Sequence, residues 1–173
     1  MPALHFLDSA RREFTYYRGL GEKTFAQLPD GDLFREPAPG NNSIAMIVKH
    51  MHGNMMSRWT DLLTTDGEKP WRQREAEFEN DLGTRAELIA RWNEGWACLF
   101  AAVDPLSPTD LERIVHIRTE PHTVVQAITR QLAHLPYHVG QIVLIGKLFR
   151  GEEFRSLSIP KGGTQAFNKA KGM

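Results

Sequence analysis

The sequence predicts an all-α protein, an antiparallel four-helix bundle with a long loop between its second and third helices and an irregular C-terminal tail. Apolar residues recur every three or four positions in four long segments, and proline and glycine mark the breaks between them. A bundle buries the apolar stripe of each helix against its neighbours. The 173 residues, 41% of them hydrophobic, fit one domain over residues 1–173, with the tail at about 151–173.

The first two helices follow from periodicity and end signals. The first is expected from about Leu4 to Leu28, where leucines and aromatic residues fall at helical spacings, and Pro29 ends it. The second begins near Ser43, a favourable N-cap residue, and continues to about Leu63.

The third helix opens at Thr84 with a capping box, and Trp92 and Trp96 on its apolar face are expected in the core. A short extended piece follows at about 111–119. The fourth helix is expected over about 121–149, and the tail beyond it has no periodicity.

The loop at residues 64–83 is polar and irregular. A loop of this length in a small domain is usually functional or docked on the surface. Its Arg72 and Arg74 either form a lip for a substrate or are solvated charges around Trp71 as an anchoring aromatic. The second arrangement is the more common one and is the expectation here.

Two histidines of the fourth helix, His134 and His138, are four residues apart and therefore point the same way. A third histidine would complete a metal site with an open position, the arrangement that makes a metal catalytic. The alternative is a pair of half-buried histidines bonded to backbone or solvent. Gln141, one turn after His138, could support a ligand or touch a substrate. Pro136 lies between the two histidines, and we expect it to kink or widen the helix there.

The third histidine is ambiguous on pattern alone. His52 lies near the centre of the second helix's apolar stripe, so periodicity would bury it. His50 lies off that stripe, on a line with Asn54, where a polar pocket could be lined. The two cues conflict.

Five stretches resemble the DinB-like (damage-inducible protein B) superfamily, and the resemblance covers nearly the whole chain. They are residues 43–50, 57–59, 64–71, 134–142 and 158–161, of which the loop and tail stretches resemble a branch of unknown function.

The resemblance implies a four-helix bundle, commonly a homodimer, with a metal held by one histidine of the second helix and two of the fourth. In that superfamily the second-helix ligand is followed directly by an apolar residue, as His50 is followed by Met51. The resemblance thus gives His50, His134 and His138 as metal ligands and leaves His52 as a neighbour.

A three-histidine site with an open position can lower the pKa of bound water to about 7 or bind a thiol as thiolate. Relatives within the superfamily include metal-dependent hydrolases and enzymes that transfer or use low-molecular-weight bacterial thiols. We therefore expect a metal-dependent hydrolase or thiol transferase that acts on a small molecule, with Gln141 and Asn54 as possible contacts. The divalent metal is expected to be zinc or nickel ahead of iron or manganese. The alternatives are a stress-related bundle that binds a metal or small molecule without turnover, and a structural bundle whose histidines are core polar groups.

Other reactive side chains are expected to be structural. Asp61 and Glu120 are weak candidates for a general base, and Cys98 among aromatic neighbours is expected to be a buried thiol. One cysteine excludes an internal disulfide and suits a reducing compartment. The 21 basic and 21 acidic residues cancel, which argues against nucleic-acid or membrane partners. Without a signal-peptide pattern or an apolar span, we expect a cytoplasmic protein.

Overall fold

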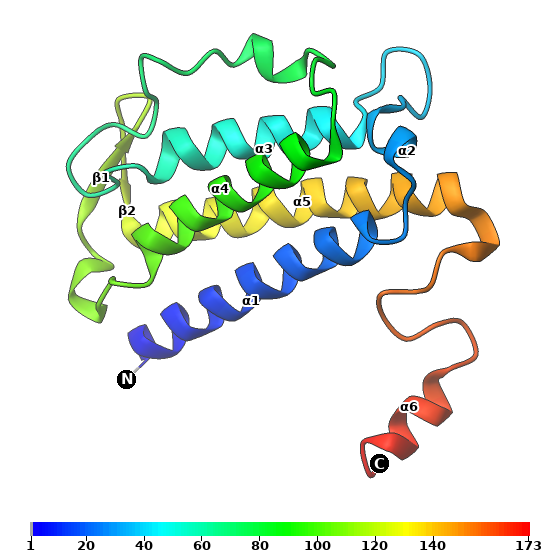
Figure 1. Cartoon of the computed structure of the whole chain (residues 1–173). Helices are drawn as coiled ribbons and strands as arrows, with labels where there is room; N and C mark the ends of the chain where they lie inside the picture. The colour runs from blue at the N-terminus through cyan, green and yellow to red at the C-terminus, as the bar shows by residue number, and fades with distance from the viewer. Residues whose placement is uncertain (1) are drawn as a thin grey trace.

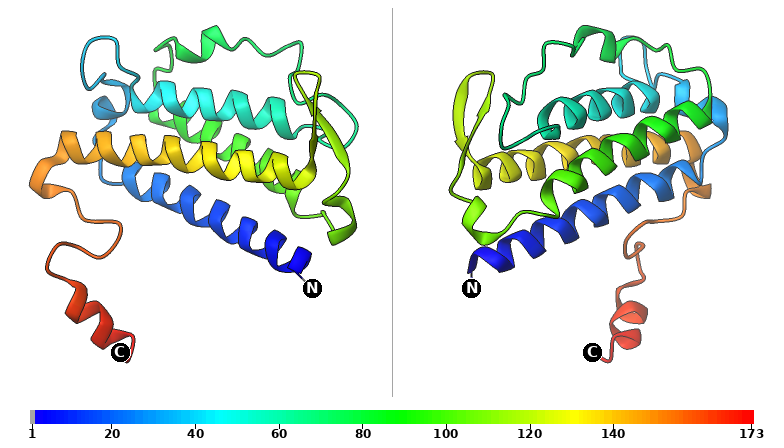
Figure 2. Two further views of the ribbon diagram at one scale, coloured as in Figure 1. Left: turned by 180° about the vertical axis from the view of Figure 1, so that it is seen from behind. Right: turned by 60° about the vertical axis from the view of Figure 1, so that its left-hand side comes forward.

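The structure is a computed structural model that describes residues 2–173. The chain is mostly helical and carries one small two-stranded sheet (Figure 1). Its four long helices are α1 (Pro2–Phe25), α3 (Ile44–Trp59), α4 (Arg85–Val103) and α5 (Val124–Arg150). Helix α3 packs on α4 and α5, and α1 packs on α5 and α4, so the four lie side by side in both views of Figure 2. The all-α prediction is confirmed at this level.

Side-chain caps set the starts of three of these helices. The hydroxyl of Ser43 accepts from the backbone N–H of Met46, and that of Thr84 accepts from Glu87. Both starts agree with the sequence prediction. Helix α5 begins later than predicted, after the cap Thr123, because the preceding residues form a strand.

That strand, β2 (Glu120–Thr123), pairs antiparallel with β1 (Ile114–Ile117), an element predicted only as a single extended piece. Arg118 and Thr119 form the turn, both with positive φ and without a glycine. The carboxylate of Asp66 accepts from both turn N–H groups, at 2.9 and 2.7 Å. A turn held by a distant aspartate has none of the glycine signals that identify hairpins in sequence.

Two short helices, α2 (Asp30–Phe34) and α6 (Thr164–Ala170), complete the helical part. Helix α6 lies in the tail that was predicted to be irregular throughout, and both views of Figure 2 place it away from the long helices. No helix within residues 2–173 combines the length and apolarity that crossing a bilayer requires.

The core is built on aromatic side chains between the long helices. Trp92 and Trp96 are buried, as predicted, with their rings edge to face at 5.5 Å. Trp92 also meets Phe25 edge to face at 5.0 Å. Gly21 of α1 faces this tryptophan so closely that an added Cβ would lie 2.5 Å from its ring. The glycine therefore allows α1 to approach α4.

We predict that Gly21→Ala lowers the free energy of unfolding by about 1–3 kcal/mol, because the new methyl group overpacks Trp92. Gly19→Ala is the matched control: no atom lies within 4 Å of its Cβ position, and alanine favours a helix over glycine by about 1 kcal/mol. Urea unfolding of both variants measures the difference. Equal stability of the two variants would contradict the close packing.

Candidate metal centre

Helices α3 and α5 bring three imidazole rings together. His50 lies on α3, and His134 and His138 lie one turn apart on α5. Nε2 of His134 is 3.3 Å from Nε2 of His50 and 3.2 Å from Nε2 of His138. The ligand atoms of all three lie within 4.8 Å of one another, so this group can hold a metal ion.

Hydrogen bonds on the opposite side of two rings fix which nitrogen carries the proton. Nδ1 of His50 donates to the carboxylate of Glu77 at 2.9 Å, and Nδ1 of His138 donates to the amide oxygen of Gln141 at 2.8 Å. In a ring whose only proton is on Nδ1, Nε2 keeps a lone pair that can bind a metal. Nδ1 of His134 has no partner among the described residues, so its Nε2 can either carry the proton and donate to a neighbouring ring or, unprotonated, join the other two around a cation.

The spacing of His134 Nε2 from the other two Nε2 atoms fits a divalent ion. Two nitrogens bound at 2.0–2.1 Å with tetrahedral angles lie about 3.3–3.4 Å apart, close to both separations found here. Burial, together with the nearby His138 and His50, lowers the pKa of His134 to about 3. Burial also lowers the pKa of His138. Neutral rings are the form that binds metals.

The competing histidine, His52, points elsewhere: its Nε2 pairs with Glu94 at 2.8 Å. Both side chains are largely covered, with 8% of His50 and 12% of His52 exposed, so the direction of the ring and not its burial separates the two histidines. Helix α3 is covered on two sides, by α4 on one side and by α5 with the loop on the other. Its apolar stripe indicates only the side that faces α4.

Sequence reasoning missed Glu77, which the loop supplies. The residue lies in a short 3₁₀ helix, η1 (Glu75–Phe78), that packs on α3 (Figure 1). Phe78 of the same turn stacks on the His50 ring at 5.0 Å. Gly53 gives the loop room, because a Cβ there would collide with the Glu77 carboxylate. Hydrophobic periodicity does not identify such a loop residue. The only sequence signal for Glu77 is an acidic residue a few positions after Arg72.

The Glu77 carboxylate is buried and charged. Burial opposes its ionisation, but hydrogen bonds from His50 and Arg72 outweigh burial and lower its pKa. Arg72 binds it through two nitrogens, at 2.7 and 2.9 Å. A carboxylate held in this way orients the His50 ring and would make it a more basic ligand for a metal.

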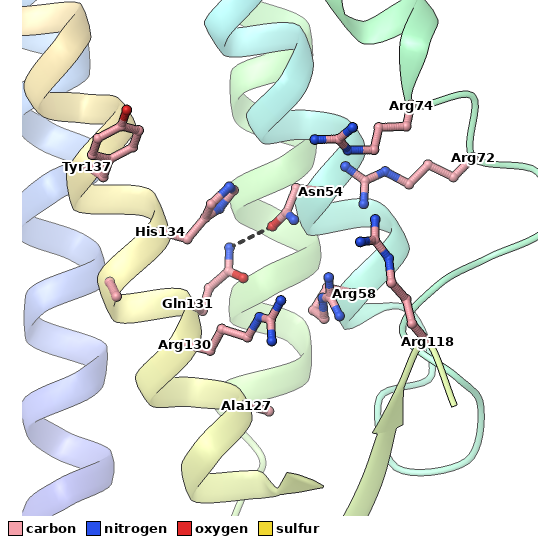
Figure 3. A pocket seen from close by; sticks show the side chains of 11 residues that line it. Asn54, Arg58, Arg72, Arg74, Arg118, Ala127, Arg130, Gln131, His134 and Tyr137 are labelled. Atoms are coloured by element: carbon pink, nitrogen blue, oxygen red, sulfur yellow. Dashed lines mark hydrogen bonds between the residues drawn. The ribbon is translucent and has the colours of Figure 1, made fainter. Parts of the chain in front are cut away.

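A cavity of about 380 Å³ opens beside this centre, bounded by α3, α5 and the loop (Figure 3). Its walls carry five arginines, together with two amides, His134, Tyr137 and two alanines. The arginines and amides are Arg58, Arg72, Arg74, Arg118, Arg130, Asn54 and Gln131. None of the described residues that line it is acidic. The cavity is thus strongly basic.

The expected surface role is wrong for Arg72, whose side chain is only 3% exposed, and Trp71, the expected anchor, is 54% exposed. The Arg74 side chain is 49% exposed, as expected, although both arginines line the cavity.

Of the other residues proposed from the sequence, only Asn54 lines the cavity. Asn54 lines the cavity and accepts from Gln131 at 3.1 Å, whereas Gln141 supports His138 and does not line it. Asp61 and Glu120 are exposed and outside the cavity. Cys98 is half-buried away from the cavity, and burial raises its pKa.

Pro136 does not interrupt the helix that carries His134 and His138. Helix α5 continues from Val124 to Arg150 through the proline. The missing N–H removes one backbone hydrogen bond, but the two ring nitrogens still converge at 3.2 Å.

Fold and site together define a mostly helical protein with a three-histidine group able to hold a metal beside a basic cavity. The chain belongs to the family described as Protein of unknown function (DUF1572), which matches residues 2–163. No curated protein and no solved structure matches it significantly.

We predict that Glu77→Ala lowers the free energy of unfolding by about 3–5 kcal/mol, because it leaves the buried Arg72 guanidinium without its main partner. Glu75→Ala, in the same turn but exposed, is expected to change stability by less than about 0.5 kcal/mol. Urea unfolding measures both. A Glu77→Ala protein as stable as wild type would show that the carboxylate does not hold the loop.

Proposed function

We propose that this chain is a metal-dependent enzyme that acts on a small molecule, as a hydrolase or a low-molecular-weight-thiol transferase. The observation that supports it most is the convergence of three Nε2 atoms, two of them on rings whose Nδ1–H is already bound. The proposal places the chain in the DinB-like superfamily, as one antiparallel four-helix-bundle domain. The opposite directions of α3 and α5, seen in the contacts of His50 with His134 and of Asn54 with Gln131, agree with it.

The ligands in this proposal are His50, His134 and His138, with zinc or nickel ahead of iron or manganese. Imidazole ligands suit these metals, and affinity order alone does not select among them. A divalent ion bound by three protein nitrogens keeps an open position, where it lowers the pKa of a water or thiol to near neutrality.

The protein's own groups orient this centre and the substrate. Glu77 and Gln141 hold the His50 and His138 rings through their Nδ1–H groups. The amides of Asn54 and Gln131 border the cavity one turn from the histidines and offer donors and acceptors to a substrate. Glu77 is fully engaged by Arg72 and His50, so it is not free to act as a base toward the cavity.

A second candidate is binding of a metal or small molecule without turnover. It is favoured by the absence of any carboxylate among the described residues that line the cavity. An assay with ester, amide and thiol-acceptor substrates distinguishes the candidates, and metal–sulfur ligation in X-ray absorption after addition of a small thiol indicates transfer.

We predict that protein purified without a histidine tag contains one divalent metal per chain, and that His138→Ala abolishes this stoichiometry while helical circular dichroism is unchanged. One of three ligands is then missing, and the helix is not otherwise altered. Elemental analysis by mass spectrometry gives the metal content. His52→Ala is the matched control and should keep full occupancy. Full occupancy in His138→Ala would refute the ligand assignment.

We also propose a homodimer, as the resemblance implies. Exposed apolar side chains follow one face of α5, namely Tyr137, Leu144 and Leu148. Their spacing of seven and four residues forms a helical stripe.

We predict that sedimentation finds a dimer at micromolar concentration and that Leu144→Glu combined with Leu148→Glu gives a monomer, since charges in an apolar interface are costly. Ala97→Glu, at an exposed position of α4, is the control and should remain dimeric. A monomeric wild-type protein would contradict the proposal.

A further inference from the structure

One arginine of the cavity has no partner although it is buried. Arg58 of α3 is only 6% exposed, and within residues 2–173 no side chain or carbonyl makes a hydrogen bond or ion pair with it. Its Nη1 atom is fully enclosed. A buried guanidinium without a partner is costly, and proteins normally pair such a charge.

Three of the other cavity arginines are already matched by acids. Arg72 is bound by Glu77 and Glu68, Arg118 by Glu68, and Arg74 lies 3.6 Å from Glu75. These arginines and acids balance one another and leave no surplus.

The fifth arginine, Arg130 of α5, has no ion pair with any described residue and is exposed at the cavity mouth. Arg58 and Arg130 therefore contribute two uncompensated positive charges to one cavity. Figure 3 shows them near each other, on the far side of the Asn54–Gln131 pair from Tyr137. Burial, and then the charges of Arg130 and Arg72, lower the pKa of Arg58 to about 10, so it remains charged at neutral pH.

We propose that Arg58 and Arg130 form an anion subsite that binds the phosphoryl group of a small-molecule substrate of the three-histidine centre. That the bound molecule is a substrate rests on the proposed function. The anion subsite itself is defined by the two arginines. A phosphate monoester carries a charge of about −1.5 to −2 at neutral pH, which matches two free guanidiniums better than one carboxylate does. Guanidinium groups also bind phosphate oxygens in a bidentate manner.

The subsite is separate from the histidine centre. Arg130 and the candidate ligand His134 are four residues apart on α5, about 6 Å along the helix, and Arg58 and His50 are eight residues apart on α3, about 12 Å along the helix. The phosphoryl group is therefore held for recognition, and the reacting bond lies about one to two helical turns away. A cavity of about 380 Å³ suits a small phosphorylated metabolite.

The test is calorimetric titration of metal-stripped protein with inorganic phosphate. We expect phosphate to bind, and Arg58→Gln and Arg130→Gln each to weaken binding at least tenfold. Arg12→Gln removes one exposed charge from α1, outside the cavity, and should leave binding unchanged, which controls for net charge. Arg130→Gln alters only an exposed side chain, so it tests the subsite even if Arg58→Gln fails to fold.

The outcomes separate this inference from the proposed metal chemistry. Phosphate binding that depends on both arginines and persists in His138→Ala supports the subsite, even if the wild-type protein never loads a metal. Stoichiometric metal without phosphate binding, or with binding unchanged in Arg58→Gln and Arg130→Gln, overturns the subsite and leaves the metal centre standing. Tighter binding of succinate than of phosphate overturns the phosphoryl assignment.

Discussion

The hydrogen bonds from Arg72 and His50 to the buried carboxylate of Glu77 join the long loop to helix α3. Because a buried carboxylate must be paired, this contact fixes the loop, and the fixed loop in turn forms one wall of the cavity. It also sets the tautomer of His50, so that its Nε2 faces the rings from α5. One interaction thus determines the shape of the cavity and the direction of a candidate ligand. A loop anchored only by surface charges would do neither.

Much of the helical part could be predicted because its causes are local. Caps such as Ser43 and Thr84, and the apolar spacing around Trp92 and Trp96, act within one or two turns and are visible in a single sequence. The hairpin was seen only as one extended strand, because its turn depends on Asp66, which lies some fifty residues away. Long-range hydrogen bonds of this kind leave no local pattern.

The candidate site was also predictable only where the cause is local. The spacing of His134 and His138 on one helix indicated a shared direction, which the structure has. The choice between His50 and His52 could not be made from periodicity, because that signal assumes one buried face and α3 has two. Glu77 could not be predicted for a similar reason: its partner His50 lies on helix α3, outside the loop that carries Glu77 and Arg72.

The three-histidine group and the cavity beside it have opposite charge preferences. The histidines, of which only His134 lines the cavity, can hold a cation, whereas Arg58 and Arg130 at the cavity carry positive charge that an anion would neutralise. A metal alone would add to the positive charge of the arginines across a short distance of low dielectric. If the proposed metal centre and the proposed anion subsite are both occupied, a phosphoryl group compensates that charge, so the metal and the anion each make the other's binding more favourable. The basic cavity would then favour anionic substrates near the histidines. This selectivity would come from Arg58 and Arg130, which have no acidic partner among the described residues.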